Sequence, residues 1–284
     1  MMHRKIPLLL AVAITFAGCS NQPASPSSAP AASDQPSEGA AAPAPSTTPT
    51  SAPEEPQPLQ QPEVKEPKRY YVDTQNFFIH SVEESANEKI ALLTFDDGPK
   101  GDSTLQILDI LDRYHAKSIW FVSGFNYGYN YLPDPHKAKK FEEMILEIRK
   151  RGHIVANHSW SHENFKQLPP DVQRKEIASL SELLEKITGE KPKFIRPPFG
   201  SYTDVFQDEV KKQGMQWMNW SVGSLDWEYT DPQKVIQQTV STMHNGANIL
   251  MHDNPVEVQA LDGILKRLTE QGYKFVLPTE VKPD

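Results

Sequence analysis

The sequence lacks the features that define several large protein classes. Its only cysteine, Cys19, has no partner for a disulfide within the chain. The formal net charge of −8 leaves no basic stripe for phosphate groups, which argues against a nucleic-acid partner. There is no internal repeat, no heptad run and no glycine-rich phosphate loop. The apolar run at residues 6–16 is too short to cross a bilayer as a permanent helix.

That apolar run follows a positively charged segment at residues 2–5 and precedes the small residues Ala17 and Gly18. This order is typical of a secretory signal. Cys19 then stands where a bacterial lipoprotein signal carries its lipidated residue, so we expect a signal peptide at 1–18 and a lipid anchor at Cys19. Each buried acyl methylene would contribute about 0.8 kcal/mol to membrane binding. The alternative is an ordinary secreted protein that is cleaved nearby.

The next segment, residues 19–68, consists mainly of Pro, Ala, Ser, Gln and Glu. Such a composition cannot bury enough apolar surface to offset the entropy of ordering the chain, so we predict no secondary structure there. Its prolines favour extended polyproline II, at about 3.1 Å per residue, and hence a semi-stiff tether. An extracytoplasmic domain on such a tether, anchored to the bacterial cell membrane, would reach a wall polymer rather than the lipid.

From residue 69 to residue 284 we predict a single domain in which strands and helices alternate. The expected strands are 90–95, 117–122, 153–157, 193–195, 215–220, 247–251 and 273–276. The expected helices are 103–114, with Asp102 or Ser103 as the N-cap, 137–151, 171–188, 203–213, 232–243 and 257–271. About seven strands separated by helices indicate parallel pairing. We expect a distorted (β/α) barrel, because candidate functional residues follow several different strands. A barrel brings the ends of many strands around one centre.

Two segments leave alternatives open. Residues 69–86 are either an N-terminal strand or an arm that packs on the domain. Residues 125–135 predict an irregular loop in which Tyr127, Tyr129 and Tyr131 alternate. These tyrosines serve either local packing of the loop or a rim on which sugars stack.

Two adjacent carboxylates, Asp96 and Asp97, follow the apolar strand that begins at Ile90. The next residues, Gly98 and Pro99, end the strand, since proline cannot donate to a ladder and glycine tolerates turn dihedrals. Adjacent strand residues point to opposite faces, so one aspartate faces a central site and the loop turns the other toward it from another angle. An isolated pair of this kind is more often a structural turn; the motifs further along the chain favour the functional interpretation.

One of those motifs holds His158 and His162 at i, i+4 spacing, which brings two imidazoles to one side of a helical turn or across a short loop. Imidazole is the preferred neutral ligand for zinc and similar ions. Such a pair alone is a weak signal, because surface helices carry it by chance. Together with one carboxylate from a neighbouring strand end it completes a two-His, one-carboxylate set, which leaves coordination positions open for water and substrate.

Five motifs therefore occur in order along the chain. They are TFDDGP (94–99), HSWSH (158–162), RPPFG (196–200), LDW (225–227) and LMH (250–252). In this order they resemble the NodB-type polysaccharide deacetylases, carbohydrate esterase family 4, over about residues 86 to 280. The resemblance implies a distorted (β/α) barrel and metal-dependent removal of N- or O-acetyl groups from sugar polymers.

The resemblance also assigns a role to each matching residue. It implies that Asp97, His158 and His162 bind the metal, with zinc expected and cobalt, nickel or manganese suited to the same set. It implies that Asp96 is the general base, Arg196 its electrostatic tether, His252 the general acid and Asp226 the residue that tunes His252. Trp227 and Leu250 would line the acetyl pocket, and the backbone N–H of Phe199 would be an oxyanion donor.

Elementary chemistry supports these roles. A bound divalent metal lowers the pKa of its water toward about 7 and polarises a carbonyl group. Arg196 would favour the ionised form of Asp96, and a histidine is suited to protonate a departing amine. One departure concerns Gly223, which stands where the family often carries a second acid, three residues before the Asp226-Trp227 pair. It puts the local loop shape and the substrate contacts in question.

These inferences predict a monomeric, metal-dependent hydrolase that removes acetyl groups from an N-acetylated glycan, with peptidoglycan as the first expectation. The same enzyme acting on chitin-like, poly-N-acetylglucosamine or O-acetylated xylan chains is a close alternative, and nothing in the sequence separates them. An alternative of another class is a non-catalytic glycan-binding lipoprotein that has kept the barrel.

Overall fold

The computed structural model describes residues 69–83 and 88–278. The predicted signal peptide, the lipid anchor at Cys19 and the tether lie outside the described residues. In the described part of the chain, no helix is long and apolar enough to cross a membrane.

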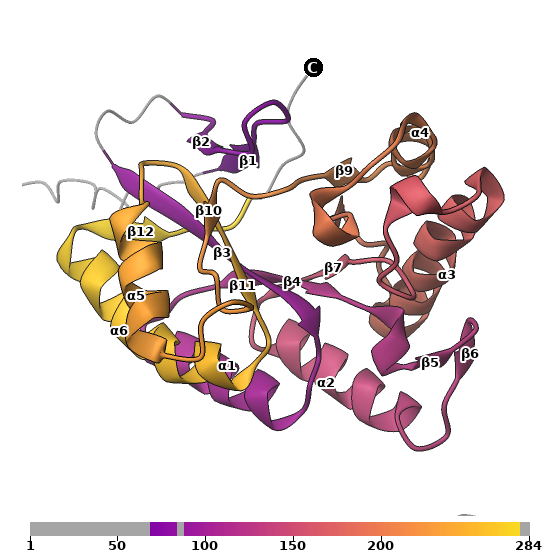
Figure 1. Ribbon diagram of the computed structural model, residues 1–284, viewed down its shortest axis with the longest axis horizontal. Helices are drawn as coiled ribbons and strands as arrows, with labels where there is room; N and C mark the ends of the chain where they lie inside the picture. Colours follow the sequence, from indigo (N-terminus) through magenta and orange to yellow (C-terminus); the bar gives the residue numbers. More distant parts are fainter. Residues whose placement is uncertain (1–68, 84–87, 279–284) are drawn as a thin grey trace, which may run out of the picture. The chain divides into compact units, whose positions relative to one another are not determined.

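The domain is built on a curved sheet in which every strand pairs in parallel, as the alternation of strands and helices predicts (Figure 1). Seven strands lie in the order β10-β11-β3-β4-β7-β8-β9, and β12 pairs with the start of β3. Their bounds are β3 (Lys89–Gly98), β4 (Ser118–Val122), β7 (Ile154–Asn157), β8 (Phe194–Ile195), β9 (Gln216–Trp217), β10 (Val222–Gly223), β11 (Ala247–His252) and β12 (Tyr273–Phe275). The edge strands β9 and β10 do not pair with each other in the described chain, so this is the predicted distorted barrel, left open along one side.

In the part of the chain that the structure describes, six α-helices connect the strands and pack around the outside of the sheet (Figure 1). They are α1 (Asp102–Arg113), α2 (Ala138–Lys150), α3 (Pro170–Thr188), α4 (Asp204–Lys212), α5 (Pro232–Ser241) and α6 (Pro255–Glu270). Local chemistry explains their ends: the Asn254 side chain caps α6 by accepting from the Glu257 N–H, and Gly189 ends α3 with a φ of 77°. The predicted N-cap of α1 is wrong, because Gly101 occupies that position and makes no side-chain cap.

The structure shows what the open N-terminal segment forms, and it corrects the sequence prediction at two other short segments. The N-terminal arm is a hairpin of β1 (Tyr70–Val72) and β2 (Ile79–Ser81). The loop at 125–135 contains a second hairpin, β5 (Gly128–Tyr129) with β6 (Leu132–Pro133), after a 3-10 turn. The strand expected at 215–220 is only the two residues of β9. The strand β10 was not predicted, because its two residues include Gly223 and glycine weakens a strand pattern.

The period of two along the central strands separates the inner face of the barrel from the outer face. Ala91, Leu93 and Phe95 pack outward, in the cluster beneath the helices, whereas Ile90 and Leu92 point inward. The inner cluster also holds Tyr70, Val72 and Ile79 of the first hairpin, which contacts the start of β3 and the Gly246 carbonyl before β11. Apolar packing therefore fills the barrel from the end where these strands begin, and the opposite end is free for polar side chains.

Candidate active site

The two aspartates at the end of β3 both reach the site because the strand bulges between them. Asp96 continues the inward series of Ile90 and Leu92, and it pairs with Phe121 of β4. The next pair joins Gly98 to Val122, so Asp97 is an extra residue in the ladder, with a φ of 68°. The Asn126 side chain donates to the carbonyls of Asp97 and Gly98 at 2.8 and 2.9 Å, which holds the bulge. Asp97 is thereby turned toward the site, as expected.

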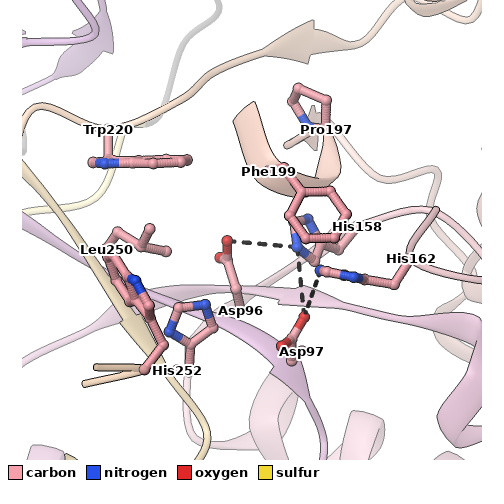
Figure 2. A pocket seen from close by; sticks show the side chains of 10 residues that line it. Asp96, Asp97, His158, His162, Pro197, Phe199, Trp220, Leu250 and His252 are labelled. Carbon is pink, nitrogen blue, oxygen red and sulfur yellow. Dashed lines mark ion pairs between the residues drawn. The ribbon is translucent and has the colours of Figure 1, made fainter. Parts of the chain in front are cut away.

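Asp97 meets both predicted histidines beside the end of β7 (Figure 2). Its Oδ1 atom lies 3.6 Å from Nε2 of His158 and 3.1 Å from Nε2 of His162. The three donor atoms lie within 4.8 Å of one another. Two segments that lie far apart in the chain, since His158 follows Asp97 by 61 positions, therefore form one compact N,N,O cluster.

This cluster fits a divalent metal ion. Oδ1 of Asp97 is buried, and none of the described residues makes a well-directed hydrogen bond to it, as for a ligand atom kept free for an ion. Nδ1 of His158 donates to the Arg196 carbonyl at 2.8 Å, so its Nε2 faces Asp97 with an unprotonated lone pair. Burial lowers the pKa of His158, which keeps this imidazole neutral. Burial opposes ionisation of Asp97, but the close imidazoles of His162 and His158, together with His252, outweigh it and lower the Asp97 pKa.

The loop between the two histidines is held by a carboxylate of α3. Glu176 is 1 % exposed and accepts hydrogen bonds from the Ser161 N–H at 2.7 Å and from the Ser161 hydroxyl at 2.6 Å. It also accepts from the Tyr131 hydroxyl at 2.7 Å. The His162 N–H donates to the Ser159 hydroxyl at 3.1 Å, which fixes the turn that carries the second imidazole. Glu176 was not predicted, because a lone glutamate in an amphipathic helix carries no signal.

Arg196 enters from the end of β8 and is fully buried beneath Asp96. Its Nη1 donates to Asp96 Oδ1 and to the Thr94 hydroxyl, both at 2.8 Å. Its Nη2 donates to the Asn219 carbonyl at 3.0 Å and to the Asn248 side chain at 3.2 Å. The second oxygen of Asp96 stays on the cavity side, 3.6 Å from Nε2 of His158.

His252 lies across the cavity from the two histidines, at the end of β11 (Figure 2). Its Nδ1 lies 2.7 Å from Oδ1 of Asp226, and its backbone N–H donates to Oδ2 of the same carboxylate at 2.7 Å. Burial disfavours the imidazolium, but the hydrogen bond and charge of Asp226 and the charges of Asp96 and Asp97 outweigh it and raise the pKa of His252. The ring is thus held in one orientation with Nε2 as its free nitrogen.

A cavity of about 410 Å³ joins these groups. Its lining residues are Asp96, Asp97, His158, His162, Pro197, Phe199, Trp220, Trp227, Leu250 and His252. The polar groups lie together at the ends of the strands, and the remaining wall is apolar or aromatic. The side chains of Phe199 and Trp227 are 66 % and 47 % exposed, so they stand at the rim of the cavity. Trp220 was not predicted as a lining residue, although an aromatic residue just after a strand is a usable signal.

The tyrosine loop serves mainly local packing. Tyr127 is buried against Phe141 and Trp160, and Tyr131 packs against Trp160 while it bonds Glu176. Tyr129 is exposed, with Lys137 over its ring.

Gly223 affects the shape of the rim. A Cβ atom there would lie 3.2 Å from the Trp227 ring, so a longer side chain would have to displace that indole. The glycine therefore makes room for Trp227, which packs edge-on against His252 at 5.2 Å between ring centroids. This is the local change in loop shape that the sequence puts in question.

The comparison with known proteins agrees with this geometry. The family model for polysaccharide deacetylase matches residues 83–218. A peptidoglycan-N-acetylglucosamine deacetylase of Bacillus cereus is 32% identical over 198 residues, which are 67% of this chain and 67% of that protein. The chain belongs to the polysaccharide deacetylase family. Peptidoglycan-N-acetylmuramic acid deacetylase PdaC of Bacillus subtilis is 32% identical over 197 residues, which are 69% of this chain but only 39% of PdaC.

Solved structures of polysaccharide deacetylases have the same fold. Peptidoglycan deacetylase PdaC from Bacillus subtilis matches with a TM-score of 0.59 and 32% identity over 67% of this chain and 88% of that one. A pseudoenzyme of the CE4 family from Bacillus anthracis matches with a TM-score of 0.59 and 28% identity over 67% of this chain and 64% of that one. Membership in the family therefore fixes the fold, whereas activity depends on the residues of this site.

Proposed function

We propose that this chain is a metal-dependent hydrolase that removes acetyl groups from N-acetylated sugars of cell-wall peptidoglycan. The observation that carries the proposal is the cluster of Asp97, His158 and His162 beside an Asp96 that is tied to Arg196, with His252 across the same cavity. A metal site, a base and an acid around one cavity are the set that amide hydrolysis needs.

We assign the metal to Asp97, His158 and His162. When bound there, a divalent ion supplies Lewis-acid activation of water and of the acetyl carbonyl. Zinc is the expected ion because two imidazoles and one carboxylate suit it, and cobalt, nickel or manganese suit the same set.

Asp96 and His252 divide the proton transfers between them. Asp96 accepts a proton from the water that attacks the acetyl carbon, and the hydrogen bond from Arg196 orients the carboxylate for this. His252, protonated and held through Nδ1 by Asp226, gives the Nε2 proton to the sugar nitrogen as the C–N bond breaks. Acetate and the free sugar amine are the products.

The cavity wall orients the acetyl group. Leu250 and Trp227 give an apolar wall for the methyl group, which is consistent with their place in the lining. The N–H of Phe199 is a candidate oxyanion donor, because it makes no hydrogen bond within the described chain and lies in the turn fixed by Pro197 and Pro198.

Peptidoglycan is favoured as the substrate by the relatives that are named peptidoglycan deacetylases and by the expected export of the chain. The test is acetate release by the purified full-length chain from peptidoglycan, chitin oligomers, poly-N-acetylglucosamine and acetylated xylan. Release from peptidoglycan alone, or fastest from it, supports the proposal. Faster release from one of the other polymers would reassign the substrate and keep the reaction.

The pseudoenzyme among the structural neighbours makes a glycan-binding role the relevant rival. Against it, this chain keeps the base, the acid and all three ligand positions around one cavity. Tight binding of glycan without acetate release, with any of the four metals added, would favour the rival.

We also propose an extracytoplasmic, lipid-anchored location with Cys19 as the lipidated residue. The test is fractionation of cells that carry the wild type or Cys19→Ala. The wild type should sediment with membranes, and the variant should not. Equal membrane association of the two would contradict the anchor.

A further inference from the structure

A second buried carboxylate lies behind the His252–Asp226 pair and has no part in the proposed reaction. Glu257, in the first turn of α6, is 0 % exposed. In the described chain no donor makes a well-directed hydrogen bond to either of its carboxylate oxygens. The polar groups that face them are the Asp226 carboxylate and the Ser224 hydroxyl, both from the segment that follows β10. The Asn254 side chain links the two residues, because it donates to Oδ2 of Asp226 at 2.9 Å and accepts from the Glu257 N–H at 2.9 Å.

Asp226 is the member of this carboxylate pair that is surrounded by hydrogen-bond donors. Its oxygens accept from the His252 N–H and lie against His252 Nδ1, both at 2.7 Å, and they accept from the Asn254 side chain at 2.9 Å. These donors stabilise a negative charge on Asp226, whereas Glu257 has no comparable set. Two adjacent buried carboxylates do not both stay ionised, because burying an unpaired charge costs far more than binding a proton.

We propose that Glu257 is a neutral carboxylic acid that donates a hydrogen bond to Asp226 and so limits the basicity of the carboxylate that holds His252. Glu257 is a positioning residue, since it acts on the reacting atoms only through Asp226. The inference rests on the proposed function for its consequence, but not for the protonation of Glu257 itself.

Further physical considerations agree with this assignment. Burial raises the pKa of Glu257 well above its usual range, and the neighbouring charge of Asp226 raises it further. A purely structural position in the first turn of a buried helix face would be filled better by an apolar residue. A donor on Asp226 spreads the carboxylate charge over one more hydrogen bond, which weakens its hold on the His252 proton.

Two variants of Glu257 distinguish a neutral donor from an ionised carboxylate, because the two states predict opposite changes in the proton dissociation constant of His252. Glu257→Gln keeps a neutral donor at nearly the same volume, and Glu257→Leu removes the donor. If Glu257 is neutral, the Leu variant should lower the proton dissociation constant of His252 about three- to tenfold, and the Gln variant should leave it nearly unchanged. If Glu257 is ionised, both variants should increase that constant, because each removes a negative charge.

The experiment is carbon and nitrogen NMR of the full-length protein labelled at glutamate and histidine, together with the pH profile of acetate release. We expect the Glu257 carboxyl signal, assigned by its loss in Glu257→Gln, to be that of a neutral acid at pH 7. We expect the alkaline limb of the rate profile to move to higher pH in Glu257→Leu only. Glu270→Gln, an exposed change on the same helix, is the matched control and should move neither readout.

An ionised Glu257 signal at pH 7, or a His252 constant that increases in both variants, would overturn this inference alone. A wild-type protein that releases no acetate from any glycan would overturn the proposed function, and the carboxyl signal of Glu257 would still decide for or against the neutral acid.

Discussion

Asp96 and Arg196 form a buried ion pair at 2.8 Å although they are 100 residues apart in the chain. The guanidinium also lies 4.3 Å from the ring centroid of Phe121 on β4, and four hydrogen bonds fix its two Nη atoms. Both side chains are shielded from water. If one partner were removed, water could not solvate the charge of the other. The ion pair therefore has two effects: it orients the proposed base, and its loss would lower the stability of the folded protein.

Removal of the guanidinium should cost both stability and activity. Arg196→Met leaves the Asp96 charge buried without a partner, so we expect the free energy of unfolding to fall by about 3–5 kcal/mol. The measurement is urea unfolding with acetate release on the same samples. The double variant Arg196→Met/Asp96→Asn should recover part of the lost stability, because it no longer buries a lone charge. Additive losses in the double variant would argue that the two groups are not coupled.

The pH dependence of the rate should report the pair of His252 and Asp226. The raised pKa of His252 keeps the proton-donating form to a pH above the ordinary value of 6.5, so the alkaline limb of kcat/KM should lie above that value. Asp226→Asn removes the charge and leaves the burial, which lowers the pKa and moves the limb to lower pH. At pH 8 this should cost at least about tenfold in rate. The exposed His136→Gln is the control, and an unmoved limb in Asp226→Asn would refute the assignment.

Glu176 should control metal affinity without binding the metal. Glu176→Ala removes the acceptor for the N–H and hydroxyl of Ser161, between the two histidines, so the imidazoles lose their fixed geometry. We expect zinc affinity to fall about 10- to 100-fold, as measured by competition with a chelating dye. Glu182→Gln, an exposed change on the same helix, should bind zinc like the wild type. Equal affinities in Glu176→Ala and the wild type would show that the loop is held by other contacts.

Glu257 should make the stability depend on pH in a predictable direction. Its carboxyl stays protonated in the folded protein, whereas in the unfolded chain it ionises above its ordinary pKa of 4.5. The unfolded state then binds fewer protons, so this residue lowers the stability of the wild type as the pH rises above 4.5. The stability of Glu257→Leu relative to the wild type should therefore increase from pH 4.5 to pH 7, by at most about 1.4 kcal/mol per pH unit. A constant difference over this range would contradict the prediction.

The sequence was sufficient for the parts of the site that follow from strand periodicity. Asp96 lies in the same inward series as Ile90 and Leu92, and His252 pairs with Asp96 across adjacent parallel strands. In a barrel of parallel strands, the carboxyl ends of the strands lie at one end of the barrel. The motif residues that follow these strands must therefore lie close to one another. For this reason the sequence predicts the barrel and those cavity-lining residues that belong to the five motifs.

The remaining features depend on tertiary contacts or on backbone conformations that residue type does not reveal. Asp97, His162 and Phe199 all have positive φ angles, between 58° and 68°, although none of them is a glycine. Such conformations cost of order 1–3 kcal/mol and persist only where the surroundings impose them. The supporting carboxylates Glu176 and Glu257 belong to amphipathic helices, where a glutamate is ordinarily a solvent-facing residue.

The most direct test compares the full-length wild type with Asp97→Ala and Asp96→Asn by elemental analysis and by acetate release from peptidoglycan. We predict about one divalent ion per wild-type chain, loss of both the ion and the activity in Asp97→Ala, and a retained ion with activity about 10²–10⁴-fold lower in Asp96→Asn. Acetate release at the wild-type rate by a protein shown to be free of metal would contradict the account.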